Sequence, residues 1–289
     1  MHELTLSLPS PLEELADDRL ASHGVRVLLK RDDLIHPDVP GNKWRKLKYN
    51  LQAAREQGHR VLLTFGGAYS NHIRAVAAAG YYFGFSTIGV IRGEEHLPLN
   101  PSLAYAEQRG MRLTYVDRTT YRMKHDQAVT DALRDQFGDF YLVPEGGSNA
   151  LALRGCAELV GEINTDFDVI CCAAGTGGTL AGIAVGLPPG KQAVGFSALK
   201  GGDFLADDVR RLQHDYGRET SNWSVETGFH FGGFARRTND LDNFINDFSR
   251  RHKIQLDRVY VGKMMFGLFS LVALGRFAPG TVVVVVITG

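Results

Sequence analysis

The stretch that decides the fold is PGNKWRKL, residues 40–47, which joins a strand-like run to a helix-like one. The strand-like run covers residues 25–30, and the helix-like run, with apolar residues at helical spacing, covers residues 44–57. The Gly-Asn pair permits a tight turn, so Lys43 falls in the first turn of the expected helix. The positive end of a helix dipole disfavours a protonated lysine there, and a neutral amine condenses with aldehydes. We therefore predict a reactive lysine at position 43, with an ordinary solvated lysine as the alternative.

Strands and helices alternate outward from this stretch along the whole chain. The expected strands are short apolar runs at residues 25–30, 61–65, 86–91, 112–116, 140–143, 169–173, 193–197 and 282–287. The expected helices cover residues 12–20, 44–57, 71–83, 103–109, 124–137, 150–163, 179–185, 204–216, 241–251 and 264–275. This order predicts an α/β fold of parallel sheets covered by helices on both faces. Ligands in such folds bind at the carboxyl ends of strands, where the glycine-rich turns of this chain fall.

Composition narrows the possible partners. The 289 residues leave room for one large or two modest domains, and 32 basic residues balance 32 acidic ones, so charge gives no case for nucleic acid or an anionic membrane. The three cysteines lack the spacing of a metal site, and we expect no metal. Residues 1–3 do not begin a signal peptide, and the longest apolar run, 282–287, is too short to span a bilayer. We therefore expect a cytoplasmic protein.

A glycine-rich turn, GTGGT at residues 175–179, follows one expected strand and opens a helix. Three glycines let several backbone N–H groups converge on an anion at the helix N-terminus, and the threonine hydroxyls add donors. No Lys-Ser or Lys-Thr pair follows, and position 180 is a leucine, so the turn is neither a P-loop nor a dinucleotide fingerprint. The turn predicts a phosphate site, with an unliganded strand-to-helix corner as the alternative.

A second turn, GGAYSNH at residues 66–72, also joins a strand to a helix. Ser70 or Asn71 is suited to cap that helix, and capping alone would explain both residue types. The alternative is a cradle of donors for a substrate carboxylate, with Asn71 bonded to a ring oxygen of a cofactor. His72 on its own fits a buried structural histidine.

Taken together, seven motifs occur in an order that resembles one family. They are KRDDL (30–34), GNKWRKL (41–47), SNH (70–72), PEGGSNA (144–150), GTGGT (175–179), YVGK (260–263) and the Thr-Gly pair at 288–289. The set resembles the pyridoxal-phosphate-dependent family of 1-aminocyclopropane-1-carboxylate deaminase and D-cysteine desulfhydrase, over nearly the whole chain. The resemblance implies the tryptophan synthase β-like fold (fold type II), with two open parallel-sheet domains that carry helices on both faces.

The resemblance also implies a cofactor, pyridoxal 5′-phosphate, and the residues that bind it. Lys43 would form the Schiff base with the cofactor aldehyde, Asn71 would bond its phenolic oxygen, and Thr288 would approach its pyridine nitrogen. The phosphate would be held by Gly175, Thr176, Gly177, Gly178 and Thr179.

For the substrate, the resemblance implies a small amino acid. Its carboxylate would bind at Ser70, Asn71 and His72, and Ser70 would also relay protons. Lys43, once released from the cofactor, would serve as the base, and Tyr260 would face the substrate as an acid or base.

Two departures from the family pattern bear on the reaction. Val261 stands where cyclopropane deaminases have a glutamate, and residues 230–236 hold no tyrosine where those enzymes have a second one. We therefore expect an α,β-elimination like that of D-cysteine desulfhydrase, giving a keto acid and ammonia. The alternatives are a cyclopropane deaminase, or a family member that binds the cofactor with little catalysis. A nicotinamide oxidoreductase would share the alternation, but the chain lacks the dinucleotide fingerprint.

The resemblance finally predicts the organisation of the chain. A smaller α/β domain at about residues 45–155 would be inserted into a larger, cofactor-binding domain formed by residues 1–44 and 156–289. The cofactor would lie in the cleft between them, and relatives of this kind are usually homodimers.

Overall fold

The computed structural model describes residues 4–288, which form two compact units. The first unit comprises residues 43–147 with the short segments 36–39 and 4–6. The second comprises residues 7–35, 40–42 and 148–288. Residues 1–3, on which the signal-peptide prediction falls, and Gly289 lie outside the described residues. The predicted cofactor-binding and inserted domains stay a prediction, because compactness alone does not show which unit binds a cofactor.

The first unit is built on a four-stranded sheet in the order β5-β4-β3-β6, and every neighbouring pair is parallel. Its strands are β3 (Val61–Gly66), β4 (Ser86–Arg92), β5 (Met111–Val116) and β6 (Tyr141–Val143). Its helices are α2 (Asn42–Glu56, which begins one residue inside the second unit), α3 (Asn71–Phe83), α4 (Pro101–Gln108), α5 (Arg118–Arg122) and α6 (Gln127–Phe137), with a 3-10 turn η2 (Glu145–Gly147). Alternate residues of β3 and β4 pack against α5 and α6 through Tyr121 and Leu133.

The second unit holds a six-stranded sheet in the order β1-β2-β10-β7-β8-β9. Its strands are β1 (Leu12–Glu14), β2 (Arg26–Lys30), β7 (Val169–Ala174), β8 (Gln192–Ser197), β9 (Trp223–Glu226) and β10 (Val282–Val286). Its helices are α1 (Asp18–Ala21), α7 (Ala150–Gly161), α8 (Gly178–Gly186), α9 (Phe204–Tyr216), α10 (Asn239–His252) and α11 (Val261–Ala273), with a 3-10 turn η1 (Asp32–Leu34). All strand pairs are parallel except β1 with β2.

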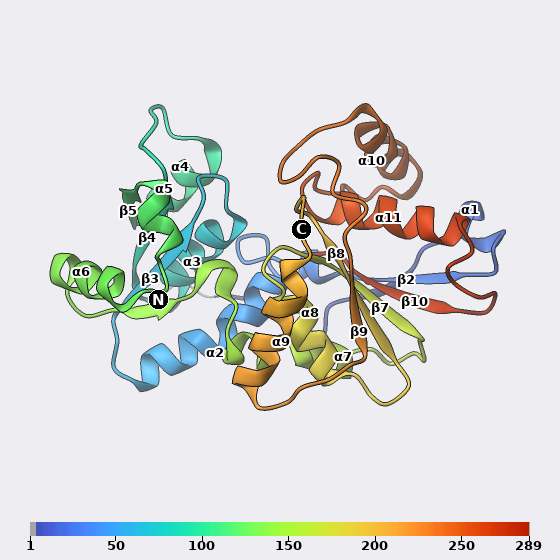
Figure 1. Ribbon diagram of the computed structural model, residues 1–289, viewed down its shortest axis with the longest axis horizontal. Helices are drawn as coiled ribbons and strands as arrows, with labels where there is room; N and C mark the ends of the chain where they lie inside the picture. Colours follow the sequence, from blue (N-terminus) through green and yellow to red (C-terminus); the bar gives the residue numbers. More distant parts are fainter. Residues whose placement is uncertain (1–3, 289) are drawn as a thin grey trace. The chain divides into compact units, whose positions relative to one another are not determined.

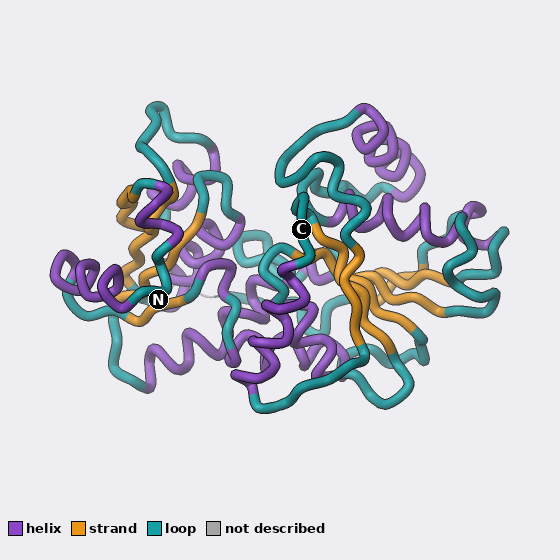
Figure 2. The backbone as a smooth tube through the Cα atoms, viewed as in Figure 1, coloured by secondary structure: helices purple, strands orange, loops and turns teal. Residues whose placement is uncertain are grey.

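Both faces of this sheet are covered, which confirms the expected α/β architecture. Successive side chains of a strand point to opposite faces, so Val283 and Val285 of β10 join the core formed with α10 and α11. Val284 and Val286 join the core formed with α7, α8 and α9. Figure 1 shows the two groups of helices on opposite sides of the strands, and Figure 2 separates the helices from the sheet by colour.

Two sequence predictions of local structure were wrong. The helix expected over residues 12–20 is instead the strand β1 followed by the short helix α1, because residues 12–14 pair antiparallel with β2. The helix expected over residues 124–137 begins only at Gln127, and a separate helix, α5, precedes it. The edge strand β9 was not predicted, since its four residues alternate polar and apolar side chains over too short a run.

The order of strands determines which loops meet. Strands β2, β10 and β7 are parallel neighbours, so the residues that follow them share the carboxyl edge of the sheet. Those residues are Arg31, Thr288 and the turn at 175–179. Within residues 4–288, no helix has the length and apolar character that crossing a membrane requires.

Candidate active site

The glycine turn lies where the sequence predicts, between the end of β7 at Ala174 and the start of α8 at Gly178. Gly177 adopts a left-handed conformation with φ 73°, which favours glycine. In the described part of the chain, no side chain caps α8 at Gly177. The first amides of α8 are therefore available to an anion rather than taken by a cap.

Both threonines of the turn are held by side chains from distant parts of the chain. Asn42 Nδ2 donates to Thr179 Oγ1 over 2.8 Å, and Ser148 Oγ shares a hydrogen bond with Thr176 Oγ1 at 2.6 Å. Because the Thr179 oxygen accepts from Asn42, the hydroxyl proton of Thr179 points away from Asn42. These contacts fix the direction in which the turn presents its donors.

Gly41 brings the segment before Lys43 against the end of β10. Its φ is 57°, and a Cβ at this position would overlap the backbone carbonyl of Thr288. The Gly41 amide also donates to the Asp32 carbonyl over 2.9 Å. Asn42, the first residue of α2, bonds the glycine turn as described, and Lys43 is the next residue, with its Cα about 3.8 Å further along the chain. Asn42 is thus tied to the glycine turn at 175–179.

In the first unit, Ser70 is the N-cap of α3, and Asn71 is its first residue. The Ser70 hydroxyl accepts from the Ile73 amide over 3.4 Å. Gly66, which ends β3, leaves no room for a Cβ, because that atom would lie 2.5 Å from Ile73 Cγ1. The backbone therefore turns closely from β3 into α3. The Ser70 side chain is half-buried and Asn71 is exposed, so both are open to a ligand.

His72 is buried, with 2% of its surface exposed. Thr64 Oγ1 donates to the Val143 carbonyl over 2.8 Å and lies 2.8 Å from His72 Nε2, so it accepts from that nitrogen. The proton of the neutral ring is therefore assigned to Nε2. Burial, together with the positive charges of Lys43 and Lys46, holds the pKa of His72 well below its usual value. The ring is neutral, and its predicted part in substrate binding stays a prediction.

Tyr260 stands at the N-terminus of α11, where Asp257 holds its backbone. Asp257 accepts from the amides of Val259, Tyr260 and Val261 over 2.7–2.9 Å. Burial raises the pKa of the Asp257 carboxyl, and these three amides act in the opposite direction. The Tyr260 ring packs on the phosphate turn, since a Cβ at Gly175 would lie 3.0 Å from its Cε1.

The structure thus brings the predicted residues together in two groups. Gly175–Thr179, Tyr260 and Thr288 gather at the carboxyl edge of the six-stranded sheet in the second unit. Ser70, Asn71 and His72 lie together at the start of α3 in the first unit, where the charge of Lys43 acts on His72. The individual roles assigned to these residues from the sequence stay predictions.

Comparison with known proteins agrees with this geometry. A family model described as "Pyridoxal-phosphate dependent enzyme" matches residues 5–289. The chain is 32% identical over 265 residues to a putative 1-aminocyclopropane-1-carboxylate deaminase of Pyrococcus horikoshii, covering 88% of this chain and 81% of that protein. It is 28% identical to a mitochondrial bifunctional D-cysteine desulfhydrase/1-aminocyclopropane-1-carboxylate deaminase of Arabidopsis thaliana, covering 93% of this chain and 73% of that protein.

The chain belongs to the family of pyridoxal-phosphate-dependent enzymes. Among solved structures, it matches an ACC deaminase homologue with a TM-score of 0.84 and 27% identity, over 99% of this chain and 90% of that one. A hydrogen sulfide-producing enzyme of Fusobacterium nucleatum, at 14% identity and a TM-score of 0.69 over 97% and 94% of the two chains, shares the fold. The predicted family, fold and cofactor are thereby confirmed.

The residues present fit a pyridoxal-phosphate-dependent enzyme. The turn at 175–179 offers backbone amides and two threonine hydroxyls, which are the donors that a phosphate group needs. It contains no carboxylate, whose negative charge would repel the phosphate. Gly177 is favoured where it stands, because its φ is 73° and a Cβ there would lie 3.0 Å from Val209 Cγ2. Lys43 follows directly on Asn42, which is bonded to this turn.

Three residues of the site were not predicted from the sequence. Asn42 and Ser148 bond the threonines of the phosphate turn, and Asp257 holds the backbone of Tyr260. Asn42 and Ser148 lie inside motifs that the sequence singles out, but their partners are 137 and 28 residues away. Such pairings have no local signal in a single sequence. Asp257 could have been found as an acidic residue three positions before Tyr260 at a helix start.

Proposed function

We propose that this enzyme is a lyase that removes sulfide and ammonia from D-cysteine or a similar small amino acid. D-Cysteine and water would give pyruvate, hydrogen sulfide and ammonia. The observation that carries this choice is the partner of Tyr260: the ring of Phe234 stands edge-on to it, with centroids 6.0 Å apart. A phenyl ring carries no ionisable proton, so the pair of phenols expected for opening a cyclopropane ring is missing at this position.

Each predicted residue has a part in this reaction. Pyridoxal phosphate, when bound, supplies a sink for the electron pair left at the substrate α-carbon. The Lys43 amine would hold the cofactor aldehyde and, once released, would take the α-proton. Tyr260 gives a proton to the departing sulfur.

The other residues bind and orient. Ser70, Asn71 and His72 would bind the substrate carboxylate, and Asn71 would also bond the phenolic oxygen of the cofactor. The hydroxyl of Thr288 would be a neutral partner for the pyridine nitrogen, and residues 175–179 would hold the phosphate.

The proposal includes a homodimer in the cytoplasm and a division of labour between an inserted domain at about 45–155 and a larger cofactor-binding domain. A reducing compartment suits Cys156, Cys171 and Cys172, which are buried thiols. Light scattering during size-exclusion chromatography measures the mass of the protein in solution and so tests the dimer. The mass of a single chain would contradict it.

Turnover of a substrate panel tests the reaction. The purified enzyme is given D-cysteine, L-cysteine, β-chloro-D-alanine and aminocyclopropane carboxylate, and keto acid, ammonia and sulfide are measured. We expect D-cysteine to yield all three. We expect Lys43→Ala to lose turnover and the visible absorption of the bound cofactor, and Lys48→Ala, in the same helix, to keep both. Keto acid from aminocyclopropane carboxylate alone would favour a deaminase, and absorption without turnover on any compound would indicate a cofactor-binding protein.

A further inference from the structure

A buried lysine stands in the first turn of α11, three residues after Tyr260. Lys263 has 1% of its surface exposed, and its ammonium donates to two backbone carbonyls, that of Gly233 over 2.8 Å and that of Ala198 over 3.1 Å. Burial lowers the pKa of Lys263, and the carboxylate of Asp257 opposes this shift. Burying a charge costs free energy, which a residue that served only to fill space would not have to offset. What the two hydrogen bonds of Lys263 hold in place therefore bears on its role.

The two carbonyls belong to different loops. Ala198 follows β8 directly, and Gly233 lies in the loop that links β9 to α10. In the second loop, Phe231 and Ala235 adopt left-handed φ angles of 52° and 55°, which are unfavourable for residues other than glycine. The side chain of Lys200, from the first loop, also lies 3.5 Å from where a Cβ on Gly233 would be. We therefore infer that contacts with Lys263 and Lys200 stabilise the conformation of the loop at residues 230–236, called the fastened loop below.

The fastened loop carries the residue that faces Tyr260. Phe234 is the next residue after Gly233, and its ring meets that of Tyr260 at 69° with centroids 6.0 Å apart. On another side, Tyr260 lies against Gly175 of the phosphate turn. Asp257 thus fixes the backbone of Tyr260 through hydrogen bonds. Gly175 and Phe234 contact its ring.

We propose that Lys263 is a positioning residue for the reaction: its ammonium ties the Gly233 and Ala198 carbonyls together and so keeps Phe234 against Tyr260. This role rests on the proposed function of Tyr260 as the proton donor. Lys263 does not touch substrate or cofactor in this scheme, and it acts through Phe234 alone.

The test replaces Lys263 by methionine, which keeps most of the length of the side chain and removes the donors. Hydrogen exchange of the full-length holoenzyme is measured first, because it needs no substrate. We expect the amides of Gly233 and Arg236, which bond within the loop, to exchange about tenfold faster in Lys263→Met. In the elimination assay we expect kcat to fall about tenfold with KM changed less than threefold, and the cofactor absorption to be retained.

Val272→Ala is the matched control. Val272 is buried on the same helix, nine residues further on, and its truncation lowers stability without touching either loop. We expect it to lower the melting temperature while leaving exchange at Gly233 and kcat unchanged. If Lys263→Met does not fold, Phe234→Ala tests the contact between Phe234 and Tyr260 instead, because Phe234 is exposed and its truncation should be tolerated. We expect the same fall in kcat.

The outcomes separate this role from the proposed function. Unchanged exchange at Gly233 in Lys263→Met would overturn the role of Lys263, whatever the activity. If Lys263→Met exchanged faster at Gly233 but kept its kcat, or if Phe234→Ala kept its kcat, the loop would not position Tyr260. Either result would also overturn the role of Lys263. A wild-type enzyme inert on every compound would instead contradict the proposed elimination, and the exchange result would still decide whether Lys263 fastens the loop.

Discussion

At the scale of single residues, Gly41 determines where the chain turns before Lys43. Its left-handed backbone and its contact with the Thr288 carbonyl are two separate demands, and only glycine meets both. The sequence predicts a tight turn here from the Gly-Asn pair. It does not predict the contact with Thr288, because the two residues are far apart in the chain and no local pattern connects them.

We expect Gly41→Ala to lower the free energy of unfolding by more than about 2 kcal/mol and to weaken cofactor binding, because the new Cβ forces Gly41 and Thr288 apart. Gly58→Ala is the control: its φ is 79°, but in the described residues no atom lies within 4 Å of a Cβ there. Gly58→Ala should lower the free energy of unfolding only by the cost of a left-handed backbone at alanine, about 1 kcal/mol. Urea unfolding measures both, and equal losses would show that the contact with Thr288 does not matter.

Asn42 is the residue whose side chain connects α2 to the phosphate turn. We expect Asn42→Ala to weaken binding of pyridoxal phosphate by about tenfold, since one hydrogen bond that orients Thr179 is lost. Gln52→Ala, which removes an exposed hydrogen bond to Glu56 on the same helix, should leave the affinity unchanged. Absorbance titration of the cofactor-free protein measures both affinities. Equal affinities of wild type and Asn42→Ala would contradict the importance of this bond.

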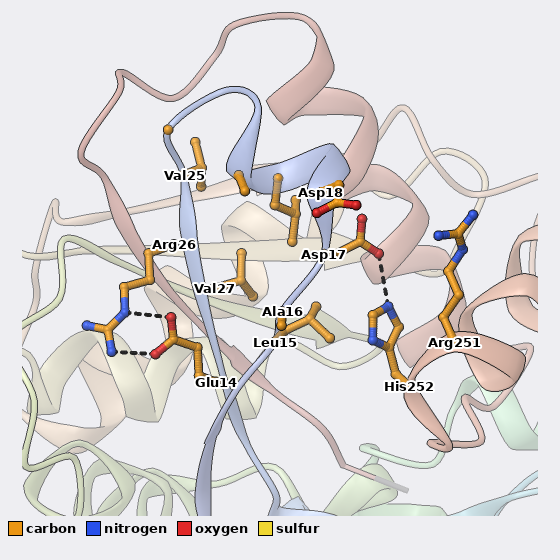
Figure 3. Close-up of a pocket in the computed structure, with 13 residues that line it drawn as sticks. Glu14, Leu15, Ala16, Asp17, Asp18, Val25, Arg26, Val27, Arg251 and His252 are labelled. Atoms are coloured by element: carbon orange, nitrogen blue, oxygen red, sulfur yellow. Dashed lines mark hydrogen bonds and ion pairs between the residues drawn. The ribbon is translucent and has the colours of Figure 1, made fainter.

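At the scale of elements, β1, α1, the start of β2 and the end of α10 line an open pocket of about 690 Å³ that is distinct from the glycine turn at 175–179 (Figure 3). It opens at the amino end of β2, whereas the turn follows the carboxyl end of β7. Asp17 lies at its wall with 1% of its side chain exposed and accepts from Arg19 and from His252 Nε2. The hydrogen bond from Arg19 is the main reason that the pKa of Asp17 lies far below its usual value.

We expect Asp17→Asn to lower the free energy of unfolding at pH 7 by about 2 kcal/mol, because the neutral amide can still cap α1 but leaves the guanidinium of Arg19 without its buried carboxylate. The lowered pKa means that this contribution is present above the pKa of an unfolded aspartate, near 3.8, and is lost as the pH falls further. The difference between wild type and variant should therefore shrink between pH 5 and pH 2. Urea unfolding at several pH values measures it.

Glu14→Gln is the matched control, since Glu14 forms a bidentate pair with Arg26 at the same pocket but in solvent (Figure 3). Exposed pairs contribute little, so we expect a much smaller loss than for Asp17→Asn. A loss as large as that of Asp17→Asn, or a difference for Asp17→Asn that does not change with pH, would contradict the assignment.

The elements themselves were predicted well where hydrophobic periodicity is strong. The central strands such as β10 are continuous apolar runs, and α3 and α9 begin and end at the predicted residues. The prediction failed for β1 and β9, at the two edges of the six-stranded sheet. Edge strands are short and half-exposed, so they owe their structure to a neighbouring strand rather than to their own pattern.

At the scale of the whole molecule, cofactor binding should stabilise the folded enzyme. A ligand at a hundred times its dissociation constant adds about 2.7 kcal/mol, which raises the melting temperature of a chain of this size by about 5 °C. We expect this rise with pyridoxal phosphate and a smaller one with pyridoxal, which lacks the phosphate that residues 175–179 are proposed to bind. Differential scanning fluorimetry measures both. Equal rises would show that the glycine turn does not bind the phosphate.

The strand order of the second unit also bears on how the protein is made. β10, formed by residues 282–286, lies between β2 and β7 rather than at an edge. A ribosome that has synthesised only the first 281 residues holds a chain whose sheet is open at its middle, with the facing edges of β2 and β7 exposed. Completion of this unit therefore waits until synthesis has passed residue 286, and until then the edges of β2 and β7 that face β10 have no strand between them.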